Sequence, residues 1–189
     1  MEIQQSEKRV QLDTYNNSWY KPGASIVKRS LWLIANALFF INPLNPSSAL
    51  KISLLRLFGA RIGRGVNIKP TVSIKCPWYL SIGNNVWIGE QVWIDNLTTV
   101  SIEDNVTISQ GAMLLTGSHD YTRVGFDLKV GKIKVESGAW IGAKAIVCPG
   151  VSCGSHSVLA VSSVATKHLE PYTIYQGNPA EPKRQRRIE

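Results

Sequence analysis

A small aliphatic residue recurs at every sixth position through most of this chain of 189 residues. A period of six matches neither the 3.6-residue repeat of an amphipathic helix nor the two-residue alternation of a half-buried strand. It is typical of a parallel β-helix, whose coils consist of three short strands that each turn one residue inward. We therefore predict an all-β solenoid with these inward residues: Ile62, Ile68, Ile74, Ile82, Ile88, Ile94, Ile102, Ile108, Leu114, Val135, Ile141, Val147, Cys153 and Leu159.

The spacing of the repeats also predicts which residues stack on one another. The first three coils contain about 20 residues each, because a slip of two residues follows each set of three hexads. Residues 20 positions apart should therefore lie one strand spacing apart, about 4.8 Å. The expected stacks are Tyr79 with Thr99 and His119, Asp95 with Leu115, and Asn96 with Thr116.

The chain divides into three parts by the character of its sequence. Residues 1–58 should form an N-terminal arm and a helical hairpin, residues 59–176 the β-helix, and residues 177–189 a basic tail. The first 22 residues are polar, and we expect them to form an extended or loosely docked arm. The tail suits the phosphate groups of a ligand, although a basic terminus can also be a solvated, mobile end.

An apolar helical segment precedes the solenoid. We predict one helix over residues 24–41, with the apolar run Leu31 to Ile41, and a second helix with Ser47 or Ser48 as its N-cap. The apolar run is too short to cross a membrane, which takes about 20 residues. Two compatible interpretations remain: the hairpin covers the open end of the solenoid, or it rests on the cytoplasmic membrane as a basic amphipathic element.

The composition favours an anionic partner in a reducing compartment. The net charge is +8, but no helix-turn-helix, zinc-finger or RNP-like pattern indicates nucleic acid, so a phosphorylated ligand or an anionic membrane explains the excess equally well. Three cysteines, an odd number, argue against a disulfide framework, and Cys153 is expected to pack in the core. No cysteine pairs with histidines at metal-site spacing, so no metal site is predicted. The N-terminus carries no signal-peptide core, which favours the cytoplasm.

The six-residue period stops between Leu114 and Val135, which predicts a loop over residues 117–134 that leaves the third coil. Insertions of this kind in a solenoid commonly carry the function. His119 lies at the root of this loop, and an imidazole is suited to general-base catalysis. Either the neighbouring Asp120 or a backbone carbonyl could orient the ring. The other two histidines, His156 and His168, are interpreted as surface residues.

Aromatic residues mark two further surfaces. Trp87, Trp93 and Trp140 each end a hexad and should point outward. Such side chains either pack against another subunit or stack on a sugar ring, and both interpretations remain open. Trp78 and Tyr79 belong to the corner beneath His119, so this corner is the better candidate for binding an acceptor.

Several motifs resemble one known family. Residues 57–182 are similar to the hexapeptide-repeat acyltransferases, whose fold is a left-handed parallel β-helix. Within that family, the chain resembles the O-acetyltransferases of exopolysaccharide synthesis, of the colanic-acid type, which also have a short helical N-terminus. The segments that carry the resemblance are 57–63 (LFGARIG), 116–120 (TGSHD), 138–143 (GAWIGA), 149–151 (PGV) and 177–180 (GNPA).

The resemblance implies a homotrimer with active sites between neighbouring solenoids and acetyl-CoA as the acyl donor. His119 matches the catalytic base of the family, which takes the proton from a sugar hydroxyl as that oxygen attacks the thioester directly. A backbone N–H near Ala143 would stabilise the oxyanion. The family often has a lysine where this chain has Glu181, so Lys183 or Arg184 is expected to replace it at the 3′-phosphate of CoA.

Further site residues follow from the resemblance and from the stacking. Trp140 matches a residue beside the pantetheine arm, and the remaining expected contacts to CoA are Ala143, Ser162, Thr166, Lys167, Lys183 and Arg184. The expected acceptor contacts are Trp78, Tyr79, Asp95 and Asn96.

Four functions compete at this stage. The first is transfer of acetyl to a saccharide of a surface polysaccharide, either in the cytoplasm at large or at the inner face of the membrane. A second keeps the chemistry but uses a small free sugar, an oligosaccharide or an antibiotic hydroxyl. A metal-dependent enzyme of the carbonic-anhydrase type would need three converging histidines, which His156 and His168 do not supply. The fourth is a non-catalytic trimeric scaffold, because a fold alone does not prove an activity.

Overall fold

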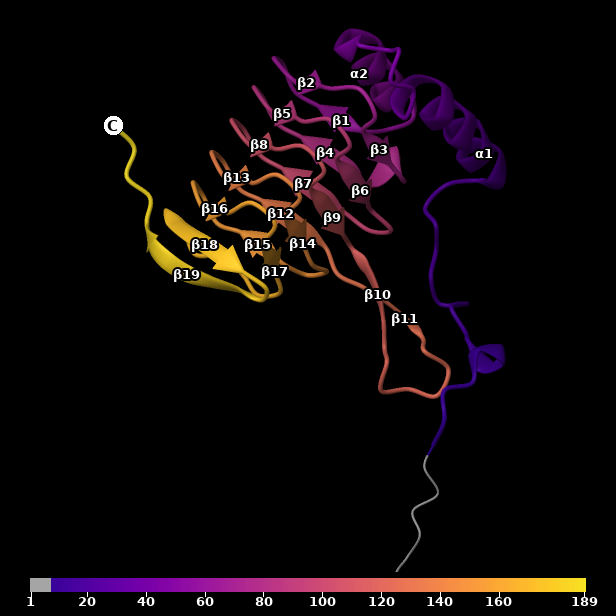
Figure 1. Ribbon diagram of the computed structural model, residues 1–189. Coiled ribbons are helices and arrows are strands. Elements are labelled where there is room, and N and C mark those ends of the chain that lie inside the picture. The colour runs from indigo at the N-terminus through magenta and orange to yellow at the C-terminus, as the bar shows by residue number, and fades with distance from the viewer. Residues whose placement is uncertain (1–7) are drawn as a thin grey trace, which may run out of the picture.

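The computed structural model describes residues 8–189 and confirms the parallel β-helix with two short helices at its N-terminal end (Figure 1). Three sheets run along the solenoid, here named A, B and C. Sheet A contains β1 (Arg61–Ile62), β4 (Leu80–Ile82), β7 (Val100–Ile102), β12 (Ile133–Val135) and β15 (Ser152–Cys153). Sheet B contains β2 (Asn67–Ile68), β5 (Trp87–Ile88), β8 (Thr107–Ile108), β13 (Trp140–Ile141), β16 (Val158–Leu159), β18 (Thr173–Gly177) and β19 (Ala180–Gln185). Sheet C contains β3 (Ser73–Ile74), β6 (Trp93–Asp95), β9 (Met113–Leu115), β14 (Ile146–Val147) and β17 (Val164–Ala165).

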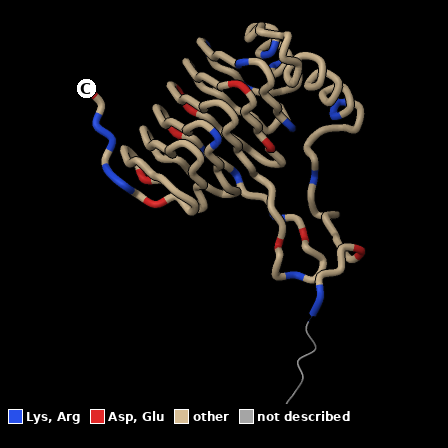
Figure 2. Tube along the Cα trace, in the orientation of Figure 1, with Lys and Arg blue, Asp and Glu red and all other residues tan. Residues whose placement is uncertain are grey.

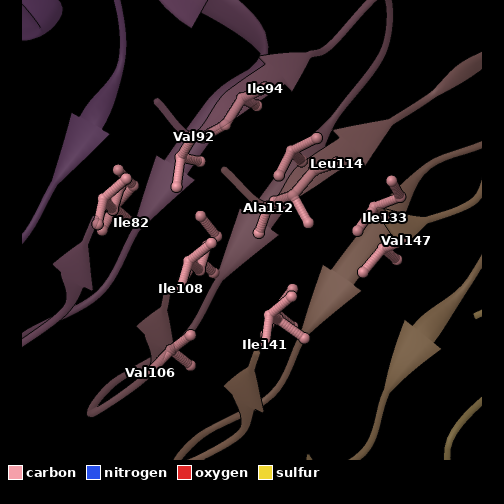
Figure 3. Packing of buried hydrophobic residues seen from close by; sticks show 14 of the residues in the cluster. Ile82, Val92, Ile94, Val106, Ile108, Ala112, Leu114, Ile133, Ile141 and Val147 are labelled. Carbon is pink, nitrogen blue, oxygen red and sulfur yellow. The ribbon is translucent and has the colours of Figure 1, made fainter. Parts of the chain in front are cut away.

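The core consists of the inward residues of the repeat. Every predicted inward residue is buried except Ile62, which lies in the first coil and is half-buried. Figure 3 shows how they form stacked columns, with Ile94 beside Leu114 and Ile108 beside Ile141. Because parallel coils superimpose each residue on its equivalent, aliphatic side chains of similar size recur at these positions.

The helical hairpin covers the open end of the solenoid. It comprises α1 (Ile26–Ala35), which continues as the π-helical η2 (Asn36–Phe40), and α2 (Ser48–Leu57). One side chain of the hairpin meets the first strand of each sheet: Trp32 Nε1 donates to a carbonyl of β3 at 2.8 Å, Ser48 Oγ accepts from an N–H of β2 at 2.9 Å, and Arg56 donates to a carbonyl of β1 at 2.8 Å. These bonds satisfy edge groups that would otherwise remain unpaired.

Lys51 is the central polar residue of this cap. Its side chain is fully buried beneath α2. The ammonium donates to the carbonyl oxygens of Asn45 at 2.9 Å, Ile68 at 3.2 Å and Lys69 at 3.1 Å. Burial lowers the pKa of Lys51, because a low-dielectric environment disfavours the charged form. The three carbonyls use all three N–H donors, which is the condition for burying an ammonium group.

The loop between the third and fourth coils is a β-hairpin that projects from the solenoid (Figure 1). Its strands are β10 (Gly117–His119) and β11 (Leu128–Val130), which pair antiparallel. The predicted stack of Asp95 with Leu115 is confirmed, but the stack of His119 on Thr99 is wrong. Leu80 to Val100 spans 20 positions, whereas Val100 to its partner Ile133 spans 33, so the hairpin adds 13 residues. The coil therefore resumes at Ile133, whose N–H donates to the carbonyl of Thr99 at 3.1 Å.

The N-terminal arm is docked on this side of the molecule (Figure 1). Residues 1–7 of the expected arm lie outside the described part of the chain. The expectation about a signal peptide concerns these residues. Beyond them, η1 (Leu12–Thr14) follows Gln11, whose N–H donates to the carbonyl of Val124 in the hairpin loop at 2.9 Å. Tyr20 Oη donates to the carbonyl of Leu97 at 2.8 Å. The arm thus connects the hairpin loop to the helical cap.

The C-terminal segment folds back as a strand. β19 pairs antiparallel with β18 at the far end of sheet B from the helices. Arg186, which follows β19, donates to the carbonyl of Gly138 at 2.9 Å. Residues 180–186 of the basic tail are therefore ordered against the last coils, and Lys183 and Arg184 lie on a defined strand.

Candidate active site

His119 ends β10, and its ring is held by the far side of the same loop. Nδ1 lies 2.8 Å from the carbonyl oxygen of Phe126. A carbonyl oxygen can only accept a hydrogen bond, so Nδ1 carries the hydrogen and Nε2 is the unprotonated nitrogen of the neutral ring. This geometry leaves Nε2 available to take a proton from another molecule.

Two aromatic rings pack beside this imidazole. The ring of Phe126 stacks on it, with 4.5 Å between centroids and 8° between planes. The ring of Tyr15, from the N-terminal arm, lies 5.9 Å away at 51°. Sequence reasoning missed both residues. Nothing in the sequence pairs an arm residue with a loop more than 100 positions later, because that contact depends on tertiary structure alone.

Asp120 does not orient the imidazole. Its carboxylate accepts the hydroxyl of Thr122 at 2.6 Å and forms an ion pair with Lys129 at 3.1 Å. The hydrogen bonds from Thr122 and Lys129 hold the pKa of Asp120 below its usual value. Of the two orienting groups that the sequence left open, the structure selects the backbone carbonyl, and Asp120 instead shapes the loop.

A second group of predicted site residues gathers at the corner between sheets B and C. Trp140 is 45% exposed and donates from Nε1 to Ser109 Oγ at 2.9 Å. Ala143 lies in the turn after β13, and its carbonyl accepts the N–H of Ser162 in the next coil at 2.9 Å. Its own N–H has no acceptor within residues 8–189. This corner therefore offers a free backbone donor beside an exposed indole.

A groove of about 360 Å³ runs along the same corner toward the helical cap. Its wall includes Trp87, Gly89, Glu90 and Ser109. Because Ser109 also accepts the hydrogen bond of Trp140, the groove begins next to that indole. An elongated ligand at the corner could continue into it.

The other residues expected to contact CoA lie on different parts of the surface. Thr166 and Lys167 are exposed and directly follow β17, so they lie at the C-terminal end of the strands of sheet C, whereas Ala143 precedes this sheet. Lys183 and Arg184 are exposed on β19 of sheet B. Within one chain, the structure thus brings Trp140, Ala143 and Ser162 together but not the remaining residues of this group.

His119 and Ala143 of one chain lie near opposite ends of the strands of sheet C. Ala143 is in the turn that enters sheet C, whereas the loop of His119 leaves from the end of β9 in that sheet. Five residues separate the entering turn from the end of the strand, which is about 16 Å at the rise of extended chain. A general base and an oxyanion donor must both lie about 3 Å from the reacting atoms. One chain alone therefore does not complete a site from these two groups.

A cavity of about 660 Å³ lies between α1, the arm and sheet C. Two of the predicted acceptor residues, Trp78 and Asp95, line it. Asp95 forms an ion pair with Lys75 at 2.8 Å, and Leu97 at the rim lies against Gly117 of the loop. The cavity thus presents a carboxylate, an ammonium and an indole near the root of the histidine loop.

Trp78 and Tyr79 also hold the arm in place. Trp78 Nε1 donates to the carbonyl of Pro22 at 2.8 Å, and Tyr79 Oη donates to that of Lys21 at 3.1 Å. The two rings belong to η3 (Pro77–Tyr79). Their polar atoms are already paired, so only their ring faces remain for contact with a ligand.

Asn96 does not face the cavity, which corrects the sequence prediction. Its side chain is fully buried, and its amide donates to the carbonyl of Cys76 at 2.7 Å and accepts the N–H of Cys76 at 2.9 Å. Asn96 therefore pairs both backbone groups of a residue in the preceding coil. An amide flanked in this way has no surface with which to contact a sugar.

Asn96→Ala should therefore lower stability without changing affinity for substrate. The buried N–H of Cys76 would lose its partner, whereas the carbonyl of Cys76 would keep only the N–H of Tyr79, at 3.0 Å, which predicts a loss of about 2 kcal/mol in the free energy of unfolding. Urea unfolding measures this change, and the exposed Asn85 provides the control as Asn85→Gly, which suits its positive φ of 55°. A normal unfolding curve together with a raised KM for the acceptor would restore the binding role.

The remaining histidines and cysteines have structural environments. His156 stacks on Tyr172 at 4.7 Å, and His168 Nδ1 accepts the N–H of Ser152 at 3.0 Å. Burial raises the pKa of Cys76 to about 11 and that of Cys153 to about 12, so these thiols stay protonated. Within the described chain, no group of three or more histidine, cysteine or acidic residues is arranged to hold a metal ion.

Comparison with known proteins gives this site a context. No protein-family model matches the chain. A protein of Escherichia coli K12 named "Putative colanic acid biosynthesis acetyltransferase WcaF" is 34% identical over 164 residues, which cover 87% of this chain and 90% of that protein. The chain therefore belongs to the hexapeptide-repeat acetyltransferase family. Within the family, it is similar to the WcaF protein over most of the length of both.

Two solved structures share the fold. A hexapeptide-repeat acetyltransferase of Vibrio cholerae in complex with acetyl-CoA has a TM-score of 0.75 and 24% identity, over 88% of this chain and 92% of that chain. A galactoside acetyltransferase in complex with coenzyme A has a TM-score of 0.73 and 25% identity, over 84% and 80% of the two chains.

Proposed function

We propose that the protein transfers acetyl from acetyl-CoA to a saccharide hydroxyl in surface polysaccharide synthesis, with His119 as the general base. The observation that carries this proposal is the contact of 2.8 Å between His119 Nδ1 and the Phe126 carbonyl, because it leaves Nε2 as the proton acceptor. The name of the WcaF relative suggests the pathway, and the solved complexes with acetyl-CoA and CoA suggest the donor. Because acetyl-CoA is the proposed donor, a cytoplasmic reaction is part of the proposal.

The proposed reaction is a direct transfer in a ternary complex. The acceptor hydroxyl donates a hydrogen bond to His119 Nε2, and its proton passes to that nitrogen as the oxygen attacks the thioester carbonyl carbon. A C–O bond forms, and the resulting oxyanion is stabilised by the free N–H of Ala143. The C–S bond then breaks, and the imidazolium returns the proton to the departing CoA sulfur. The products are an acetyl ester and free CoA.

A homotrimer is part of this proposal, because the base and the oxyanion donor of one chain lie near opposite ends of the strands of sheet C. In a ring of three chains, His119 of one chain meets the Ala143 corner of its neighbour. Trp87 and Trp93 are exposed on sheets B and C and provide apolar contact area for such an assembly. Size-exclusion chromatography with light scattering measures the number of chains directly.

The cavity of about 660 Å³ is the proposed entrance for the acceptor. Asp95 is suited to accept hydrogen bonds from sugar hydroxyls, and Trp78 presents a ring face to a pyranose. Tyr15 lies next to His119 and closes the site on the side of the arm. The wall carries two basic side chains beside the one carboxylate, which suits a neutral or acidic sugar.

The 3′-phosphate of CoA is assigned to Lys183 or Arg184. The register of β19 shifts at Lys183, which interrupts the alternation of side chains along the strand, so both residues remain candidates for the contact. Replacing both with alanine should weaken CoA binding about tenfold, the range for loss of one charge-assisted contact. Calorimetry with CoA and with 3′-dephospho-CoA measures the effect, and the dissociation constant for dephospho-CoA should not change. An equal loss for both ligands would contradict the assignment.

An acceptor screen at fixed acetyl-CoA tests the proposed function. Release of CoA thiol and mass spectrometry of the product would be followed for polysaccharide repeat units, simple sugars, oligosaccharides and aminoglycosides. Acetyl ester formation on a repeat unit supports the proposal, and transfer only to small free sugars or antibiotics would replace it with the alternative acceptor class. Absence of CoA binding by a folded, trimeric protein would instead indicate a scaffold.

A further inference from the structure

The net positive charge of the protein comes from one section of the chain. Residues 14–89 contain nine lysine or arginine residues and no aspartate or glutamate. The rest of the chain contains the other 12 basic residues and all 13 acidic ones, so its net charge is −1 against +9 for residues 14–89. This basic section comprises the end of the arm, the helical cap and the first coil with part of the second, and Figure 2 shows its helices with blue positions and no red ones.

An apolar surface lies within this basic section. Val27, Leu31, Ile34, Leu38 and Ile41 follow the spacing of one helical face, and each is at least 48% exposed. They lie on α1, on η2 and on the residue that follows η2, which also borders the cavity of about 660 Å³. The opposite side of these helices contacts the solenoid through Trp32, Asn36 and Phe40. From Ser30 to Leu50 the chain contains no charged residue. Capping the solenoid therefore uses one face of the helix and leaves a second, apolar face in solvent.

We infer that this outer face of α1 and η2 docks on an anionic phospholipid surface. The stripe supplies apolar side chains to the boundary of the acyl chains, and the exposed Lys21 and Arg29 lie at its N-terminal rim. Basic residues beside an apolar helical face are attracted by anionic lipid headgroups. No helix in residues 8–189 is long and apolar enough to cross a membrane, so the element would lie along the surface.

The charge distribution favours lipid over a second copy of the chain as the occupant. If two copies packed face to face through this surface, each would bring a section of charge +9 without an acidic residue to compensate it. Like charges brought together at an interface are strongly unfavourable. An anionic bilayer supplies the opposite charge and an apolar layer at once. This inference does not depend on the acetyltransfer reaction.

Vesicle sedimentation of the full chain tests the inference. Binding should be strong to vesicles of phosphatidylcholine mixed with phosphatidylglycerol, weak to phosphatidylcholine alone, and reduced by added salt. The double variant Leu31→Glu, Ile34→Glu should lower the fraction bound at least about tenfold, because it places two carboxylates in the apolar stripe. Its matched control is Val161→Glu, Ile188→Glu, which makes the same charge change at two exposed apolar positions distant from α1.

The outcomes separate lipid binding from other roles of the face. Anionic vesicle binding that the first variant loses and the control keeps supports the inference. Absence of binding, or equal binding by both variants, overturns it. Light scattering without lipid covers the remaining case: if Leu31→Glu, Ile34→Glu alone reduces the number of associated chains, a second copy occupies the face and the inference is wrong. Circular dichroism melting confirms that each variant is folded.

Discussion

Replacing His119 with alanine is expected to lower the rate of acetyl transfer at least about 10²-fold, the low end for loss of a general base. The imidazole is the group whose free Nε2 is positioned by a carbonyl contact on Nδ1. Its removal should leave CoA binding intact, because the proposed contacts to CoA do not include the imidazole. The loss should therefore appear in kcat, measured as CoA release under saturating donor and acceptor, with little change in the dissociation constant of CoA.

His156→Ala is the matched control for this experiment. Its ring also stacks on an aromatic side chain, Tyr172, and its Nδ1 lies 2.7 Å from Ser155 Oγ. It lies between β15 and β16, away from the loop. This variant should keep wild-type activity. If His119→Ala retains wild-type kcat while folded, His119 is not the base and the proposed mechanism is wrong.

Lys51→Met should lower the free energy of unfolding by about 3 kcal/mol, which is more than the loss expected for Asn96→Ala. Methionine preserves most of the side-chain volume but removes the ammonium. The carbonyls of Asn45 and Lys69 would then be left without a donor beneath α2, and the carbonyl of Ile68 would keep only the hydroxyl of Ser48, at 3.0 Å. The relief from no longer burying a charge offsets part of this cost, which sets the estimate below the sum of three lost bonds.

Urea unfolding followed by circular dichroism measures this effect. Lys132→Met serves as the control, because Lys132 is exposed. The free energy of unfolding of this variant should differ from that of the wild type by less than about 0.5 kcal/mol. Early loss of the helical signal is also expected, since the bonds join α2 to the first coil. Equal midpoints for Lys51→Met and wild type would show that the cap does not need the buried ammonium.

The fold could be predicted from the sequence because a β-helix repeats its constraint. Each coil must place an aliphatic residue at the same inward position, so Ile68, Ile88 and Ile108 report the same environment and errors at one position are corrected by the others. The same regularity located the loop, where the repeat stops. It failed where the chain leaves the coil, because counting from Thr99 to His119 assumes that no residues were inserted between them.

The candidate site could be predicted only in part. The residue type and its place at the break in the repeat identified His119, but its partners, Phe126 and Tyr15, depend on how the loop and the arm fold back. Stacking paired Asp95 with Leu115 correctly but did not show that the Asn96 amide points inward whereas the Asp95 carboxylate pairs with Lys75. Net charge indicated an anionic partner, whereas the structure adds that the basic section also bears an exposed apolar face.

A crystal structure of the assembled protein with acetyl-CoA is the most direct test of the central claim. An attacking oxygen lies about 3 Å from the carbonyl carbon and about 3 Å from its base. The account therefore predicts that the thioester carbon, held at the Ala143 corner of one chain, lies about 6 Å or less from His119 Nε2 of a neighbouring chain. A bound thioester with no His119 of any chain within about 10 Å would contradict the proposed catalytic role, because no hydroxyl could then contact both.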